Sequence, residues 1–363
     1  VSAPPGYGKT TLAADWIAYR RQLDGESAAT DSVDDTRPCF AWYTLDDDDN
    51  DVSRFLTYLI VAFQRLAPES SKEGLLALES QRRPSTTALL AALLNEISGR
   101  EQQVTLVLDD FQQICSRAVQ EAVAFLVEHQ PDCLHVIIIS RVDPPLPLAL
   151  LRSQGRLLEV RQGALQFNPS ETAEFLCETC KLAASDKMAT ALAEQTEGWV
   201  AGLQMTAHSL LQGSAVDSSP GDMARDNCHI FDYFLEEVIS RQPPVVRRFL
   251  LHTAVLNQLT ASLCDTVVDL PAQGDRLTGV LQPVNSQMML EYLQRNNHFI
   301  IAQDEQRSWF RYHHLFAEFL RRELAQKEPN LAPILHRRAS GWYAAHAMPE
   351  TAIDHALAAG EFA

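Results

Sequence analysis

The first 160 residues alternate short apolar runs with longer segments in which apolar residues recur every three or four positions. The apolar runs predict strands and the periodic segments predict helices. The predicted strands are 40–45, 104–108 and 134–139, and the predicted helices are 11–20, 54–66, 89–97 and 118–128. Strands without polar alternation, separated by helices, are typical of a parallel sheet covered on both faces, so we predict an α/β fold here.

From about residue 161 the pattern becomes mainly helical. Asn168-Pro169-Ser170-Glu171 is a helix-start signal, with an Asn cap, Pro in the first turn and Glu at the third position. Helices are predicted at 171–180, 187–196, 200–211, 231–240, 245–256, 290–296 and 313–324. The polar residues 303–308 separate two short apolar runs and predict a β-hairpin. Helices, a hairpin and a further helix indicate a winged-helix module.

Composition and charge narrow the classes of function. The formal net charge is −17 and the pI is about 5.0, which argues against a broad nucleic-acid-binding surface. No apolar run approaches the roughly eighteen residues that a membrane span needs, and the run from Val136 to Ile139 is the size of a strand. The seven cysteines are scattered and odd in number, which is typical of reduced thiols in a cytoplasmic protein. Cys177 and Cys180 form the one close pair, and we interpret them as helix residues rather than a metal or redox site.

The most acidic segment runs from Asp46 to Asp51. We interpret it as a solvated loop. The alternative is a divalent-ion site, although the segment lacks the Gly and the distal Glu of a calcium-binding loop.

The chemistry of the chain is clearest near its beginning, where residues 3–10 read Ala-Pro-Pro-Gly-Tyr-Gly-Lys-Thr. Backbone N–H groups of a Gly-containing turn at a helix start converge on phosphate oxygens. Lys9 supplies a charge for the β- and γ-phosphates, and the Thr10 hydroxyl can ligate Mg²⁺. Ala3 replaces the usual first Gly. The predicted loop residues that bind ATP or ADP are Ala3, Pro4, Pro5, Gly6, Tyr7, Gly8, Lys9, Thr10 and Thr11.

Two carboxylates end the apolar strand 104–108. Because burying a charge is costly unless it is paired, Asp109 and Asp110 suggest a metal site. Asp109 would hold Mg²⁺ through water, and Asp110 would orient or deprotonate the attacking water. The alternative is a strand that simply stops at a polar turn.

Two further residues are candidates for contact with phosphate. Arg141 follows the next strand at the same carboxyl edge, where ligands of open parallel sheets bind, and could act on the γ-phosphate. A surface arginine at a strand end is the alternative. His313 and His314 begin a helix after the hairpin, where a His can donate to a phosphate, but the residues alone favour a cap region.

These motifs, in order, resemble the nucleotide-binding domain of the signal-transduction ATPases with numerous domains (STAND). Within that class the chain is similar to the large ATP-dependent LuxR-type regulators that include the activator of the maltose regulon. The segments that carry the resemblance are 3–11, Trp42-Tyr-Thr-Leu-Asp46, Val107-Leu-Asp-Asp-Phe111 and 140–148, followed by Thr196-Glu-Gly-Trp-Val-Ala-Gly-Leu-Gln204 and Phe310-Arg-Tyr-His-His-Leu-Phe316. It covers nearly the whole chain.

The resemblance implies a weak ATPase that works as a switch. ADP would hold a closed, monomeric form, and ATP with an inducer would permit self-association and activation of transcription. His313 would contact the β-phosphate of ADP, because relatives carry a His there. An inducer-sensing repeat and a DNA-binding helix-turn-helix would lie outside this chain, so DNA and RNA polymerase would be reached only through regions absent from it.

The resemblance and the pattern together give a domain organisation. We expect a P-loop nucleotide-binding domain at 1–160, a helical domain at 161–226, a winged-helix domain at 227–325 and the start of a TPR-like helical repeat at 326–363. Residues 212–226, rich in Gly, Ser, Asp and Pro, are expected to be a linker. Only Val1 and Ser2 precede the loop, so we expect a fragment of a longer protein.

Two other functions remain open from the sequence. One is a STAND module in another signalling protein, such as a fusion to a kinase. The other is a P-loop small-molecule kinase, for which the sequence shows no acceptor-pocket motif and no base aimed at a substrate hydroxyl.

Overall fold

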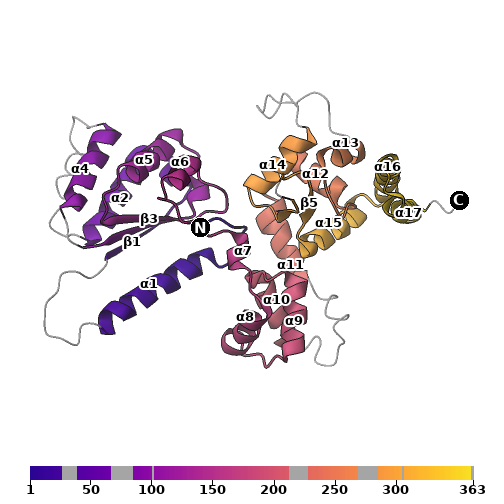
Figure 1. Ribbon diagram of the computed structural model, residues 1–363, viewed down its shortest axis with the longest axis horizontal. Helices are drawn as coiled ribbons and strands as arrows, with labels where there is room; N and C mark the ends of the chain where they lie inside the picture. Colours follow the sequence, from indigo (N-terminus) through magenta and orange to yellow (C-terminus); the bar gives the residue numbers. More distant parts are fainter. Residues whose placement is uncertain are drawn as a thin grey trace. The chain divides into compact units, whose positions relative to one another are not determined.

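The computed structural model describes residues 1–26, 39–66, 85–99, 102–211, 228–268, 285–304 and 306–360 (Figure 1). The chain forms two compact units. The first contains residues 1–3 and 8–165, and the second contains residues 4–7 and 166–363. The phosphate-loop segment is therefore divided between them, with Pro4–Tyr7 in the second unit.

The first unit is built on a parallel sheet in the order β1 (Cys39–Thr44), β2 (Val104–Asp109) and β3 (Leu134–Ile138). Beyond β3, Ser2 forms parallel bridges with Ser140 and Arg161. The Val1–Ser2 segment thus extends the sheet and enters the loop at the carboxyl edge, where β2 also ends.

Helices cover both faces of this sheet (Figure 1). On one face lies α1 (Lys9–Glu26), whose Ala13 and Ile17 pack with Val107 and Ile139. The other face carries α2 (Val52–Leu66), α4 (Thr86–Ser98) and α5 (Arg117–Glu128). Burial on both sides explains why β2 is apolar, apart from Thr105, up to its final Asp. The predicted α/β fold is confirmed. The short helices α6 (Leu148–Ser153) and α7 (Gln162–Leu165) were not predicted.

The acidic segment is exposed at Asp46, Asp47, Asp48 and Asp51, as a solvated loop would be, but it is folded and buries Asp49. It forms a short 3-10 helix, η1 (Asp47–Asn50), which Asp46 caps. Asp49 is 1% exposed and accepts hydrogen bonds from the Tyr43 hydroxyl at 2.8 Å and from Arg54 Nε at 3.0 Å. Arg54 also pairs with Asp46 and Asp48, each at 2.9 Å. Because the Arg54 guanidinium already pairs with three of the carboxylates, the structure does not support the alternative of a divalent-ion site.

Asn50 joins this segment to the turn that follows β2. Its Oδ1 accepts hydrogen bonds from the backbone N–H groups of Cys115 and Ser116, both at 2.7 Å. Its Nδ2 donates to the Gln113 carbonyl at 2.9 Å. One side chain therefore fixes the backbone a few residues beyond Asp110.

The second unit begins with a helical bundle. Asn168 caps α8 (Pro169–Glu174) with Glu171 at the third position, as the sequence predicted. The helix continues as a π-helical turn, η3 (Phe175–Thr179), followed by α9 (Asp186–Thr196) and α10 (Val200–Leu211). Its small core is formed by Leu176, Leu192, Leu203 and Ala207. The expected linker at 212–226 lies outside the described residues.

A winged-helix arrangement follows. Its helices are α11 (Cys228–Tyr233) with the π-helical turn η5 (Phe234–Ile239), α12 (Pro244–Thr253), α13 (Ala261–Val267) and α14 (Ser286–Arg295). The predicted hairpin is antiparallel β4 (Ile300–Ala302) and β5 (Phe310–Tyr312), followed by α15 (His314–Lys327). Two helices, α16 (Ala332–Ala345) and α17 (Pro349–Ala358), complete the described chain.

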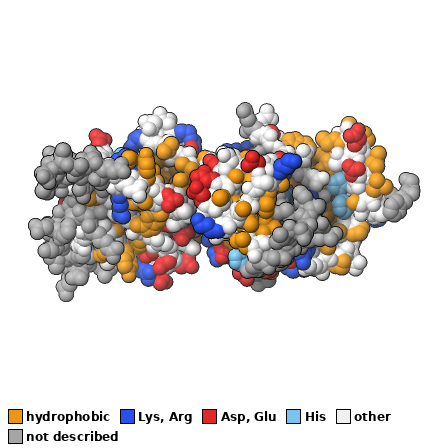
Figure 2. Space-filling view, turned by 90° about the horizontal axis from the view of Figure 1, so that it is seen from below, with side chains coloured by type: hydrophobic (Ala, Val, Ile, Leu, Met, Phe, Trp, Pro, Cys, Tyr) orange, Lys and Arg blue, Asp and Glu red, His pale blue; other side chains and the backbone are white. Residues whose placement is uncertain are grey.

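Three properties of the described residues bear on function: surface charge, helix hydrophobicity and the state of the cysteines. On the face drawn in Figure 2, acidic and basic side chains are interspersed among the coloured residues, without a continuous basic area. No helix within the described ranges is long and apolar enough to cross a membrane. The six cysteines whose side chains are described are all free thiols, including exposed Cys177 and half-buried Cys180.

Candidate nucleotide-binding site

The loop between Ser2 and α1 has the backbone of a phosphate cradle. Gly6 and Gly8 both have left-handed backbones, with φ of +79° and +72°. A Cβ built on Gly8 would meet nothing within 4 Å, so a ligand can approach the main chain closely there. Helix α1 begins at Lys9, and first-turn N–H groups of a helix lack intrahelical acceptors. These features fit the phosphates of a nucleotide.

Lys9 is held across the loop. Its amino group donates a hydrogen bond to the Ala3 carbonyl at 2.8 Å, and the residue is 9% exposed. Burial and then the charge of Arg141 lower the pKa of Lys9 to about 8, while Asp110 and Asp109 act in the opposite direction. The Lys9 amino group donates here to a neutral carbonyl. It can move to a phosphate oxygen, which is a stronger acceptor because it is charged.

Thr10 and Asp109 lie together, although 99 residues separate them in the chain. The Thr10 hydroxyl donates to Asp109 Oδ1 at 3.3 Å, and the Asp110 N–H donates to the same oxygen at 2.9 Å. Asp109 is 3% exposed, and its burial raises the pKa of the carboxyl group. The parallel sheet causes this proximity, because the strand that enters the loop and β2 end at one edge. A hydroxyl beside a carboxylate is a donor set that suits Mg²⁺.

Asp110 and Arg141 are linked through a residue that the sequence reasoning missed. Gln112 donates from Nε2 to Asp110 Oδ1 at 2.8 Å and accepts from the Arg141 N–H at 2.9 Å. Asp110 itself has φ of +56°, a left-handed conformation that Asp tolerates better than most residues. The amide therefore fixes the ends of β2 and β3 to each other. A polar residue in the turn after two aspartates was the available signal.

His313 is buried where β5 meets α15. Its Nε2 lies 2.9 Å from the Thr196 carbonyl, and since a carbonyl only accepts, Nε2 carries the proton. Its Nδ1 has no hydrogen-bond partner among the described residues. Burial lowers the pKa of His313 to about 4, with Glu197 acting against it. The ring is therefore neutral near pH 7, with a bare acceptor at Nδ1.

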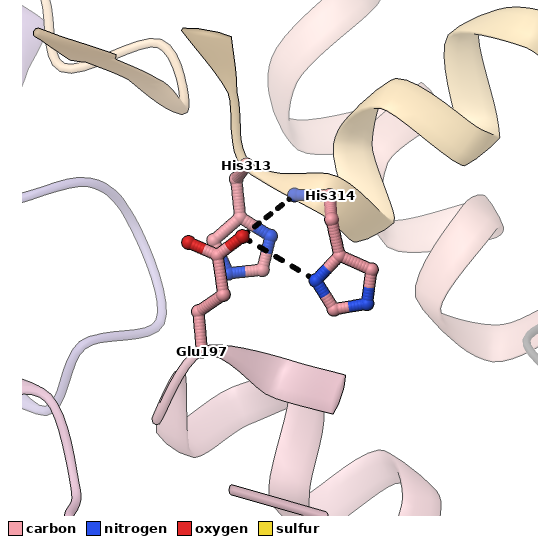
Figure 3. Close-up of side chains that lie close together, drawn as sticks. All are labelled: Glu197, His313 and His314. Carbon is pink, nitrogen blue, oxygen red and sulfur yellow. Dashed lines mark hydrogen bonds and ion pairs between the residues drawn. The ribbon is translucent and has the colours of Figure 1, made fainter. Parts of the chain in front are cut away.

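Glu197 organises the surroundings of His313 (Figure 3) and was not predicted as a site residue. It has a left-handed backbone with φ of +48°, just after α9. Its carboxylate accepts from Arg311 at 2.7 and 2.9 Å, and from the His314 N–H at 3.0 Å. Burial raises the pKa of Glu197, but the hydrogen bonds from His314 and Arg311 outweigh it and hold the pKa well below the usual range.

Ligand atoms of Glu197, His313 and His314 all lie within 4.8 Å of one another, as a metal site requires (Figure 3). The same carboxylate, however, already binds the Arg311 guanidinium through both oxygens. A divalent cation would have to displace that positive charge. The geometry therefore fits an ion pair better than a metal centre.

Comparison with known proteins shows two matching family models and similar transcriptional regulators. Residues 235–332 match the family model of the MalT winged helix domain, and residues 1–141 match that of Nephrocystin 3, N-terminal. The chain is 36% identical over 369 residues to the HTH-type transcriptional regulator MalT of Yersinia pestis (strain Pestoides F), and 34% identical over 365 residues to that of Yersinia enterocolitica. Each alignment covers 99% of this chain and 37% of the relative, so the chain spans about a third of their length.

Among solved structures, the Walker-type ATPase PABY2304 of Pyrococcus abyssi superimposes with a TM-score of 0.52 at 16% sequence identity. The match covers 88% of this chain and 89% of the other. At that identity the likeness concerns the fold alone.

Proposed function

We propose that this chain, a MalT-like STAND ATPase in sequence and fold, is the nucleotide-dependent switch module of a transcriptional regulator. The observation that carries the proposal is the contact of Thr10 with Asp109 beside a glycine-containing loop that Lys9 closes. Three groups with complementary roles toward a magnesium–phosphate ligand thus converge at one sheet edge.

Each residue has a definite role in this proposal. A bound ATP with Mg²⁺ supplies a reactive phosphoanhydride whose charge the cation partly neutralises. Lys9 would leave the Ala3 carbonyl and bind β- and γ-phosphate oxygens. Thr10 and Asp109 would hold the metal ion. Asp110, oriented by Gln112, would orient or deprotonate the attacking water, and Arg141 would bind the γ-phosphate.

His313 would distinguish ADP from ATP by contact with the β-phosphate. In the neutral ring Nε2 donates to the Thr196 carbonyl, so Nδ1 only accepts. To donate to a phosphate through Nδ1, the ring must take up a proton. The proposed contact therefore couples ADP binding to protonation of a buried histidine.

The switch itself would consist of two nucleotide states. ADP would stabilise a closed monomer, and ATP with an inducer would favour self-association, with slow hydrolysis returning the protein to the ADP state. DNA, RNA polymerase and the inducer would be bound by parts of the parent protein outside this chain. The interspersed surface charge in Figure 2 supports a role that needs no DNA contact from the face drawn there.

Isothermal titration calorimetry of the 363-residue chain with Mg²⁺–ATP and Mg²⁺–ADP tests the proposal. We expect both nucleotides to bind with one-to-one stoichiometry and to bind more weakly when EDTA removes the metal. A chain that is folded by circular dichroism but produces no binding heat with either nucleotide would refute the function. Single-turnover hydrolysis of radiolabelled ATP then measures whether the chain is a slow ATPase.

A further inference from the structure

The indole of Trp199 is bound to the first half of the loop. Trp199 is fully buried at the start of α10, directly after the left-handed residues Glu197 and Gly198. Its Nε1–H donates to the Pro5 carbonyl at 3.1 Å. The Ala201 N–H donates to the next carbonyl, that of Gly6, at 3.0 Å. Two consecutive carbonyls of the loop are therefore held by donors from one short segment.

The fit between the loop and this segment leaves no space for a side chain. A Cβ on Gly6 would lie 2.7 Å from Trp199 Nε1 and 2.7 Å from Ala201 Cβ. A Cβ on Gly202 would lie 2.5 Å from Trp199 Cε3. These distances are shorter than non-bonded atoms tolerate. Glycine at position 6 therefore lets the loop backbone contact the indole, and glycine at position 202 lets the backbone of α10 do so.

The other side of the indole contacts the aromatic core of the second unit. It stacks on Phe234 with ring centroids 5.2 Å apart at 12°, and it meets Phe299 edge-on at 5.4 Å. The His313 ring lies 6.2 Å away, also edge-on. Since these neighbours lock the ring on several sides, the direction of its N–H is fixed by packing.

Fixing the two carbonyls also fixes two N–H groups. In a trans peptide the C=O and N–H point in opposite directions, and the described chain contains no cis peptide bond. With the Pro5 carbonyl facing Trp199, the Gly6 N–H points away from the indole. With the Gly6 carbonyl facing Ala201, the Tyr7 N–H likewise points away. These are main-chain donors of the loop that would receive phosphate.

We propose that Trp199 is a positioning residue for nucleotide binding: its indole N–H, together with the Ala201 N–H, sets the orientation of the Gly6 and Tyr7 peptide groups in the phosphate-binding loop. The inference rests on the proposed function, because it assigns Trp199 to a loop that binds phosphate. Trp199 itself would not touch the nucleotide. It would also join the loop to the core that contains His313, so that the two proposed phosphate contacts share one support.

The test removes the indole N–H donor of Trp199 and preserves the shape of the side chain. Incorporation of 3-benzothienylalanine at position 199 keeps a bicyclic aromatic ring of nearly equal size but substitutes sulfur for the N–H donor. We expect the Kd for Mg²⁺–ADP to rise about tenfold, the scale of one lost hydrogen bond to a buried carbonyl, while the melting temperature without nucleotide stays close to wild type. Trp199→Phe should show the same loss of affinity with a larger loss of stability.

The matched control places 3-benzothienylalanine at Trp342, which is buried in α16 and has no described contact with the loop. This variant should bind Mg²⁺–ADP like the wild type. Wild-type affinity in the position-199 variant, or an equal loss in the position-342 variant, would overturn the positioning role. If the wild-type chain itself fails to bind nucleotide, the proposed function fails instead, so the two failures are distinguishable.

Discussion

Arg311 binds Glu197 through two parallel hydrogen bonds, Nη1 to Oε1 at 2.7 Å and Nη2 to Oε2 at 2.9 Å, although 114 positions separate the two residues. The pair joins the turn between α9 and α10 to strand β5 of the hairpin. The turn also contains Trp199, and the strand leads directly into His313. The ion pair therefore fixes both elements that support the proposed site from within the second unit.

Glu197→Gln should lower the free energy of unfolding by about 1–3 kcal/mol at pH 7, because the half-buried guanidinium of Arg311 loses its charged acceptor. The pKa of Glu197 is below the value of about 4.3 for an unfolded chain, so its contribution is complete above that pH and is lost as the pH falls further. The difference between variant and wild type should shrink toward pH 3. Urea unfolding at several pH values measures it.

The control for this prediction is Glu237→Gln. Glu237 also pairs with an arginine, Arg241, at 2.8 Å, but both side chains are more exposed than the Glu197 carboxylate. An exposed pair contributes about 0.3–0.5 kcal/mol. Equal effects of the two substitutions would contradict a special role for the less exposed Glu197–Arg311 pair.

Lys9→Ala should abolish binding of Mg²⁺–ATP and Mg²⁺–ADP, because the loop then loses its point charge for the phosphates. Calorimetry measures the loss, and circular dichroism checks the fold. The comparison variant is Lys187→Ala, which removes an exposed lysine at the start of α9 and should bind normally. Retained affinity in Lys9→Ala would remove the loop from the proposed site.

Nucleotide affinity should fall as the pH rises through about 8. Lys9 has a pKa of about 8 in the structure, and contact with phosphate favours its protonated form, so binding takes up a proton once free Lys9 has lost it. Above pH 8 the Kd should increase up to about tenfold per pH unit. Lys9→Arg remains charged throughout, and its affinity should be less dependent on pH between 7 and 9.5. A wild-type chain with constant affinity over this range would contradict the assignment.

Asp110→Asn should slow ATP hydrolysis by about 100-fold or more while leaving the Kd for ATP within a small factor of wild type. The amide keeps an oxygen for Gln112 Nε2 but cannot take a proton from water. Single-turnover rates measure hydrolysis, and calorimetry measures binding. Asp132→Asn, at an exposed position before β3, is the control. Normal turnover in Asp110→Asn would show that another group activates the water.

His313→Ala should weaken ADP binding more than ATP binding, since the proposed contact is with the terminal phosphate of ADP. Neutral His313 must gain a proton for that contact, so wild-type ADP affinity should rise as the pH falls from 8 toward 6, and the variant should lack this component. Calorimetry in two buffers of different ionisation enthalpy measures the proton uptake. Equal losses for both nucleotides would mean that His313 only supports the fold. His129→Ala, exposed at the end of α5, should change neither affinity.

The sequence predicted the fold well where the determinants are local or periodic. The largely apolar run that forms β2 required burial on both faces, and the Asn168 capping box marked the start of α8 correctly. The similarity to MalT-type regulators that the ordered motifs indicated was confirmed. The short helices α6, α7 and α13 were not predicted, because fewer than two helical turns are too short to show a repeat of apolar positions.

The candidate site was predictable only in part, because some of its contacts join segments that are distant in the sequence. The loop motif indicated Lys9 and Thr10, and the rule that parallel strands end at one edge indicated Asp109. The roles of Glu197, Trp199 and Gln112 depend on contacts between distant segments, for which residue type and spacing give no signal. The burial of Asp49 in the acidic segment was not predicted, because its partner Arg54 belongs to the following helix and becomes a partner only when the turn closes.

Asn50 shows how narrow the choice of residue can be inside a run of aspartates. The position requires one oxygen that receives two main-chain N–H groups and, on the same carbon, a donor for the Gln113 carbonyl. Aspartate offers the oxygen but repels that carbonyl, and Gln has the right groups on a longer stem. A single-nucleotide change converts an Asn codon to an Asp codon, so the mutation is easy to acquire and conservative by inspection. In a survey of variants, position 50 should tolerate far fewer substitutions than its acidic neighbours Asp47 and Asp51.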